Sequence, residues 1–283
     1  MVENTGLVLE GGGFRGIYTA AVLDVFLKEN IRFRYLMGVS AGAAYGVSYV
    51  SGQYERNLRV NNYVSDRRYC SISNFITTGN YFNWEFVFKE IPTKLVPFDY
   101  AGFSASGTRM RVAITNCVTG KAEYFDLDGA SPDRFRDLLA ATSSLPLVSR
   151  MQTFDGKLYM DGGIADAIPV NQALLEGNNR VVVILTRPPG YRKKPSSAGR
   201  FLKYFYPRYP EMVQTFKERA DRYNRTLNLL EALEKEGRAY IIRPRHAIGV
   251  SRLENKPDKL KTAYFEARME AGKILPGLKE WLG

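Results

Sequence analysis

The fold is decided by one short stretch, Gly38-Val39-Ser40-Ala41-Gly42. The five residues before it, 33–37, predict a short buried strand, and the small apolar residues from 41 to 50 predict a helix. A Gly-x-Ser-x-Gly sequence between a strand and a helix is typical of a nucleophile elbow, because the flanking Gly38 and Gly42 let the backbone turn sharply and expose the serine hydroxyl. The stretch therefore predicts Ser40 as a nucleophile.

A glycine-rich loop opens the chain, with the sequence Glu10-Gly11-Gly12-Gly13-Phe14-Arg15-Gly16 between a predicted strand at 5–10 and a predicted helix at 15–28. Consecutive glycines at a helix start leave backbone N–H groups unpaired, so that Gly11, Gly12 and Gly13 could hold a developing negative charge. The same spacing also fits a dinucleotide-binding loop, which requires an acidic residue about 20 positions on. No acid occurs between Ile31 and Ser40, so an oxyanion hole is favoured.

A third glycine motif, Asp161-Gly162-Gly163, follows a predicted strand. Asp-Gly is a common hairpin turn, which is one interpretation of this motif. However, Asp155-Gly156 already supplies a turn just before it. A catalytic carboxylate at a strand end is the other interpretation, and the motif alone leaves both open.

The histidine content bears on the type of catalysis. A Ser-His-Asp triad needs an imidazole, and the one histidine, His246, lies among cations in Arg243-Pro244-Arg245-His246, as a surface loop histidine would. The sequence therefore favours a two-residue dyad of Ser40 and Asp161. An aspartate of ordinary pKa is a weak base toward a serine hydroxyl, so such a site would depend on a desolvated Ser–Asp contact and a strong oxyanion hole.

In this order, the three motifs resemble the signatures of the patatin-like phospholipase family. Further segments agree with the resemblance, which covers roughly residues 5–186: Ala113-Ile114-Thr115-Asn116, residues 140–146 and Ile168-Pro169-Val170. It implies Ser40 as nucleophile, Asp161 as base, the Gly11–Gly13 backbone as oxyanion hole and Arg15 as support for that loop. It also implies supporting roles for the motif glycines Gly16, Gly38, Gly42, Gly162 and Gly163. The family often has Asp where this chain has Glu10. The implied activity is hydrolysis of acyl esters of phospholipids and other lipids, without a cofactor.

Predicted strands and helices alternate along the first two thirds of the chain, which favours an α/β fold with a mostly parallel sheet covered on both faces. Together with the resemblance, this predicts a three-layer α/β/α sandwich. A Pro/Gly boundary at 187–190 divides the chain into a catalytic domain, 5–186, and a mainly helical C-terminal extension packed on it, 187–283. Within the extension we expect one long helix at 211–237, a short strand at 240–242 and a helix at 256–273.

The net charge of +11 lies entirely in the C-terminal third. Residues 1–186 carry 18 Lys and Arg against 18 Asp and Glu, whereas residues 187–283 carry 22 against 11. Residues 187–210 hold seven cations, no acid and six aromatic rings. This composition suits peripheral contact with an anionic membrane, although it would also suit single-stranded nucleic acid or a solvated basic loop. We expect a lipid partner and no nucleic acid.

The aromatic segment at 69–88 is a second candidate for lipid contact. It contains Tyr69, Phe75, Ile76, Tyr81, Phe82, Trp84, Phe86 and Phe88. These side chains could form an apolar cap over an acyl pocket, or they could simply pack in the core.

The remaining expectations concern compartment and class. Two cysteines in unrelated contexts indicate neither a disulfide framework nor a metal site, and we expect no metal. The N-terminus lacks the pattern of a signal peptide and no apolar run is long enough to span a bilayer, so a cytoplasmic protein is expected. Besides a lipid hydrolase, an acyltransferase or small-ester esterase with the same dyad remains open, as does a basic membrane- or nucleic-acid-binding protein with a vestigial site.

Overall fold

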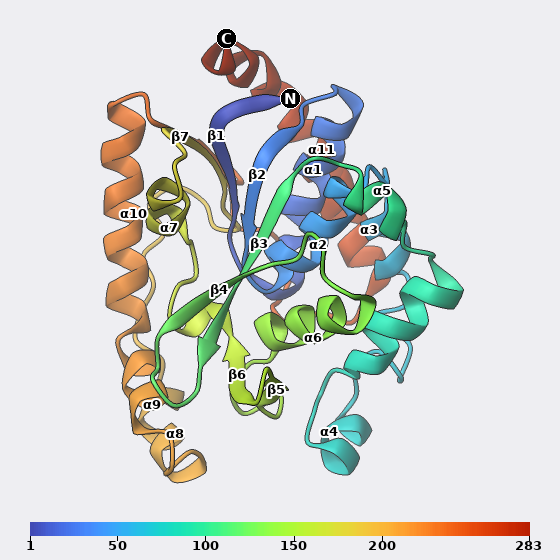
Figure 1. The fold of residues 1–283 in the computed structure, drawn as a ribbon, viewed down its shortest axis with the longest axis vertical. Helices are drawn as coiled ribbons and strands as arrows, with labels where there is room; N and C mark the ends of the chain where they lie inside the picture. Colours follow the sequence, from blue (N-terminus) through green and yellow to red (C-terminus); the bar gives the residue numbers. More distant parts are fainter.

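An eight-stranded sheet runs through the centre of the protein in the computed structural model, which describes residues 1–283 (Figure 1). Its strands are β1 (Val2–Leu9), β2 (Phe33–Gly38), β3 (Arg109–Asn116), β4 (Ala122–Asp126), β5 (Gln152–Phe154), β6 (Lys157–Asp161), β7 (Arg180–Ile184) and β8 (Ala239–Ile242). They are ordered β5-β6-β3-β2-β1-β7-β8, and β4 pairs with β3. The pairs β3–β2, β2–β1, β1–β7 and β7–β8 are parallel. The pairs β3–β4, β3–β6 and β5–β6 are antiparallel.

Alternating side chains of the central strands supply two separate cores. On β1, Leu7 and Leu9 belong to the larger core, whereas Val8 belongs to the smaller core on the opposite face. Likewise, Leu36 of β2 faces the larger core and Tyr35 the smaller one. Because successive strand residues point to opposite faces, a sheet that is apolar on both faces needs a helical layer on each side.

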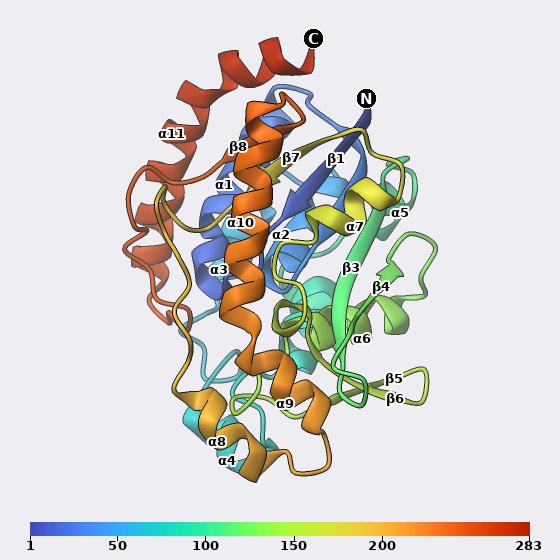
Figure 2. The same ribbon diagram turned by 90° about the vertical axis from the view of Figure 1, so that its left-hand side faces the viewer.

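The helices form these two layers (Figure 1 and Figure 2). One face is covered by α1 (Ile17–Lys28), α2 (Ala41–Val50), α3 (Arg56–Asn61), α5 (Tyr100–Ser104), α6 (Pro132–Ser143) and α11 (Pro257–Leu282). The other face is covered by α7 (Val170–Leu175) and α10 (Arg219–Lys235). The short elements η1 (Gly13–Gly16), α4 (Ile72–Thr78), η2 (Phe86–Leu95), η3 (Gly162–Ile164), α8 (Ala198–Phe205) and α9 (Pro210–Lys217) complete the chain. The predicted three-layer α/β/α fold is confirmed.

The C-terminal third is built into the same sheet and core. Strand β8 extends the sheet in parallel beside β7, with Val181 opposite Ala239. Helix α11 packs along α1, and its buried Tyr264 hydroxyl donates to Asp24 of α1 at 2.8 Å. Residues 187–283 therefore supply a strand and helices to both layers, in addition to packing on the rest of the chain.

Several predicted element bounds are wrong. The single helix expected at 211–237 is two helices that meet at Glu218. The two helices pack in different places: Met212 of α9 lies in a separate cluster of 4 buried residues beside β6, whereas Tyr223 of α10 lies in the smaller of the two cores on the sheet. The helix expected at 256–273 continues to Leu282, and the one expected at 15–28 begins with the 3₁₀ turn η1. The 187–210 segment contains α8, and the aromatic stretch contains α4 and leads into the π-helix η2.

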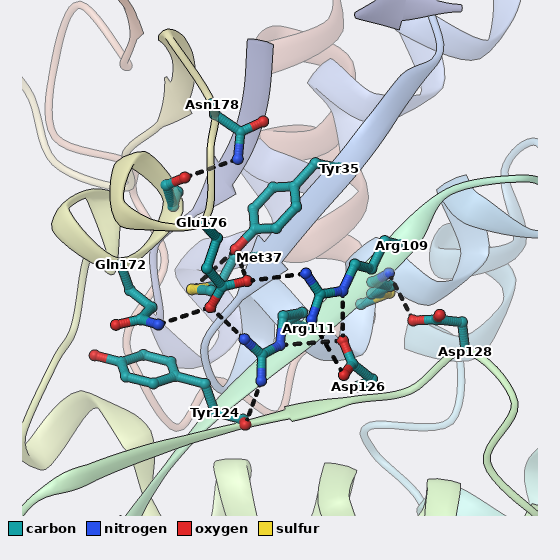
Figure 3. Close-up of polar contacts among 12 residues, drawn as sticks. Tyr35, Met37, Arg109, Arg111, Tyr124, Asp126, Asp128, Gln172, Glu176 and Asn178 are labelled. Atoms are coloured by element: carbon teal, nitrogen blue, oxygen red, sulfur yellow. Dashed lines mark hydrogen bonds and ion pairs between the residues drawn. The ribbon is translucent and has the colours of Figure 1, made fainter. Parts of the chain in front are cut away.

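A polar network fixes α7 to the sheet (Figure 3). Glu176, at the end of α7, accepts hydrogen bonds from Tyr35 of β2 at 3.0 Å and from Gln172 at 2.7 Å, and it pairs with Arg111 of β3. Tyr124 of β4 extends the connection by donating to Asp166 at 2.8 Å. The network thus holds the segment that follows Asp161 against the sheet.

Candidate active site

The elbow at Ser40 joins the carboxyl end of β2 to the start of α2. Ser40 has φ 53° and ψ −125°, a conformation that costs a non-glycine residue about 1–3 kcal/mol and needs support from its surroundings. Its N–H donates to the Thr142 hydroxyl at 2.9 Å, and that hydroxyl donates to the Ala113 carbonyl at 2.7 Å. A β-carbon at Gly42 would lie 2.6 Å from the Leu9 carbonyl oxygen, which explains the glycine two residues after Ser40.

Asp161 ends β6 and lies beside Ser40, although the two residues are far apart in sequence. Its Oδ1 accepts from the Gly163 N–H at 2.7 Å, and the Ser40 hydroxyl is close enough to influence the pKa of the carboxyl group. Burial raises the pKa of Asp161 above its ordinary value, and the nearby Arg219 guanidinium, the Ser40 hydroxyl and the Gly163 N–H oppose that rise. A carboxylate in this environment is a stronger base than an exposed aspartate.

The glycine loop presents free backbone donors next to the elbow. The Gly12 and Gly13 N–H groups donate to no protein acceptor, whereas the Gly11 N–H makes a long bond of 3.4 Å to the Ala167 carbonyl. Gly13 has φ +58°, and a β-carbon there would lie 2.5 Å from the Arg252 carbonyl oxygen, so only glycine fits without displacement. The same Arg252 carbonyl accepts from the Phe14 N–H at 3.2 Å and holds the loop in place.

The loop is also supported from its two ends. Buried Glu10 accepts from the Tyr223 hydroxyl at 2.7 Å and from the Thr186 hydroxyl at 3.0 Å. Arg15 is buried, and burial together with nearby Arg187 lowers its pKa to about 10. The remaining motif glycines all pack closely, because a β-carbon would lie within 3.0 Å of a neighbouring atom at each of Gly16, Gly38, Gly42, Gly162 and Gly163.

An apolar cavity of about 120 Å³ opens at Ser40. Four aromatic residues of the 69–88 segment line it: Tyr69, Phe82, Trp84 and Phe88. Phe75 and Ile76 of the same segment instead project from α4 into solvent. The aromatic segment therefore supplies both a cavity wall and an exposed apolar helix.

Thr142, which supports the elbow, lies in the 140–146 segment that agrees with the family resemblance, although nothing in the sequence indicates a role of its own. Two other residues near this centre carry no motif in the sequence: Arg219 lies near Asp161, and Arg252 packs on Gly13 and lines the cavity. His246, by contrast, is exposed and does not line the cavity. No group of three or more His, Cys, Asp or Glu side chains is arranged to hold a metal ion.

Comparison with known proteins identifies the family. The model of the patatin-like phospholipases matches residues 7–174, more than half of the chain. The chain belongs to the patatin-like phospholipase family. A second model, a domain of unknown function (DUF6363), matches residues 209–283. Family membership supports a lipid acyl hydrolase activity in general terms.

Two individual proteins are similar to the chain. The uncharacterized protein YjjU of Escherichia coli (strain K12) is 32% identical over 196 residues, which cover 64% of this chain and 52% of that protein. The chain thus spans about half the length of this curated relative. The crystal structure of VipD from Legionella pneumophila aligns with a TM-score of 0.48 and 14% identity, over 96% of this chain and 67% of that one. None of the helices is both long enough and apolar enough to cross a membrane.

Proposed function

We propose that the protein hydrolyses acyl esters of phospholipids or related lipids through a dyad of Ser40 and Asp161. What supports the proposal is that Ser40 lines the apolar cavity, has Asp161 beside it, and lies next to a loop with two unpaired backbone N–H groups. An acyl chain would lie among the aromatic side chains of the cavity, with its ester carbonyl at Ser40.

In the first half of the reaction, the Ser40 oxygen attacks the ester carbonyl carbon while Asp161 takes the hydroxyl proton. The carbonyl oxygen becomes an oxyanion that accepts hydrogen bonds from the Gly12 and Gly13 N–H groups. Collapse of the tetrahedral intermediate breaks the bond to the alcohol, which leaves with the proton from Asp161. In the second half, Asp161 takes a proton from water, the hydroxide attacks the acyl-enzyme, and the fatty acid leaves as Ser40 regains its proton.

Product analysis tests this proposal. Wild-type protein should release free fatty acid from a phospholipid in water, and S40A should release none while retaining its thermal unfolding midpoint. In the presence of a second alcohol, transfer of the acyl group in preference to its release would favour an acyltransferase. Retained turnover in S40A would contradict the proposed chemistry.

We also propose that two short helices bring the cavity to a lipid surface. The α4 helix exposes Ile72 and Ile76, and α8 exposes Phe201 and Phe205, each more than half accessible. Both helices lie at the end of the molecule toward which β1 runs, the end that carries the elbow and the glycine loop (Figure 1 and Figure 2). Exposed cations on α8, and the absence of any acid between 187 and 210, favour an anionic bilayer.

Vesicle binding by S40A checks this second part. Two double substitutions, I72S/I76S and F201S/F205S, are each introduced into S40A. Each should weaken binding to anionic vesicles at least about tenfold, since burial of one large apolar side chain contributes about 1.5–3 kcal/mol. The matched control is M269S, because Met269 is equally exposed on α11. Equal binding by all variants would contradict docking through α4 and α8.

A further inference from the structure

Five cationic side chains lie near one another and near the carboxylates of Glu10 and Asp161, and we call them the cationic cluster: Arg15, Arg187, Lys193, Arg219 and Arg252. An Nη atom of Arg219 lies 3.1 Å from the position of a β-carbon at Gly163, the residue that donates to Asp161. Arg252 packs on Gly13 and lines the cavity with Ser40. Arg187 Cζ lies 4.6 Å from the centroid of the Tyr191 ring, and Lys193 Nζ lies 4.6 Å from that of the Tyr223 ring.

The cationic cluster lacks matching anions. Its nearby carboxylates are Glu10 and Asp161, and both already accept hydrogen bonds from other groups. None of the five cations forms an ion pair, and the buried Nε atoms of Arg15 and Arg219 have no hydrogen-bond partner. Burial and mutual repulsion lower the pKa of Lys193 to about 7. Arg15 is buried and the other four cations are half-buried, and unpaired positive charge removed from water is costly, so this arrangement favours binding of an anion.

The chemistry of the cations indicates which anion. Planar guanidinium groups match the oxygens of a phosphate with paired hydrogen bonds, and a lysine adds a point charge. Because Arg252 lines the same cavity as Ser40, an anion held there would lie beside an ester bound at the nucleophile. A phospholipid carries a phosphate and acyl esters on one glycerol, which fits this placement.

We propose that the cationic cluster binds a phosphate group beside the dyad, either on a phospholipid headgroup or as free phosphate. As a headgroup site, it rests on the proposed lipid hydrolase function. Four of its five residues lie beyond residues 7–174, which the family model matches, and two lie in the domain of unknown function. The C-terminal third therefore completes the active site by recognising phosphate.

The test compares two monomeric substrates with the same acyl chain, 1-acylglycerol 3-phosphate and uncharged 1-acylglycerol, below their micelle concentrations. Wild-type kcat/KM should favour the phosphate-bearing ester by about tenfold or more, since hydrogen bonds to a charged group are stronger than those between neutral groups. K193M/R252M should lose this ratio. The control K235M removes an exposed cation from α10 and should keep it. Calorimetry on S40A then measures binding of inorganic phosphate, with and without K193M/R252M.

If wild type prefers the phosphate-bearing ester and the double variant loses this preference in kcat/KM, the site binds a lipid headgroup. If wild type shows no such preference but S40A binds inorganic phosphate and the double variant does not, the site binds free phosphate. The absence of both in wild-type and S40A protein overturns the proposal, and this result does not depend on how the double variant folds. Failure of the hydrolase function would be recognised separately, as no turnover of either ester, while phosphate binding could still be measured.

Discussion

Thr142 connects the turn at Ser40 to the sheet, so its removal should weaken both stability and the proposed reactivity of Ser40. Its hydroxyl accepts from the Ser40 N–H at 2.9 Å and donates to the Ala113 carbonyl at 2.7 Å, with all three residues buried. T142V keeps the shape of the side chain but leaves one donor and one acceptor without a partner. Each unpaired buried group costs about 1–3 kcal/mol, so we expect a loss of about 2–6 kcal/mol in the free energy of unfolding.

T142S is the matched control, because it keeps the hydroxyl and removes only a methyl group, which costs about 0.8 kcal/mol. Urea unfolding at pH 7 should rank wild type, T142S and T142V in decreasing stability. The rate of labelling by a fluorophosphonate should fall far more in T142V than in T142S, because Ser40 holds an unfavourable backbone conformation that Thr142 supports. Equal losses in the two variants, in both assays, would refute this reasoning.

Three further predictions follow from burial and close packing. The pKa of Asp161 is raised, so kcat/KM should fall as the pH drops through a value above 3.8; an acid limb at or below 3.8 in a pH–rate profile would contradict this. Burial raises the pKa of Asp24 from 3.8 to about 6, so the stability of wild type relative to D24N should fall by about 2 kcal/mol between pH 4 and 7, measured by urea unfolding. G13A should lower kcat at least about 100-fold, because the new β-carbon would clash with the Arg252 carbonyl oxygen and move the proposed oxyanion donors. G129A has a similar φ but lies in open space and should keep kcat, so similar steady-state kcat values for the two variants would contradict this prediction.

The fold could be predicted from the sequence where local patterns determine it. Alternating apolar residues in β1 and β2 require cover on both faces, and the glycines beside Ser40 mark a turn that packs against Leu9. By contrast, apolar periodicity continues through Glu218, so the change of direction there depends on which clusters the two helices meet in three dimensions.

The candidate site divides in the same way. Ser40, Asp161 and the glycine loop stand in recognisable motifs, and the structure brings them together. Arg219 and Arg252 have no motif, because their roles arise from tertiary contacts between the C-terminal third and the catalytic loops. The uneven charge of the chain was the only signal for them, and charge alone could not separate a membrane-facing cation from one beside Asp161.

The most direct test of the dyad is intact-mass analysis after treatment with a fluorophosphonate, on wild type, S40A and D161A. We expect one adduct on wild type, none on S40A and slowed labelling of D161A, because the probe reacts with an activated serine next to an oxyanion hole. No adduct on folded wild-type protein, or an equal adduct on S40A, would contradict the assignment of Ser40 as nucleophile.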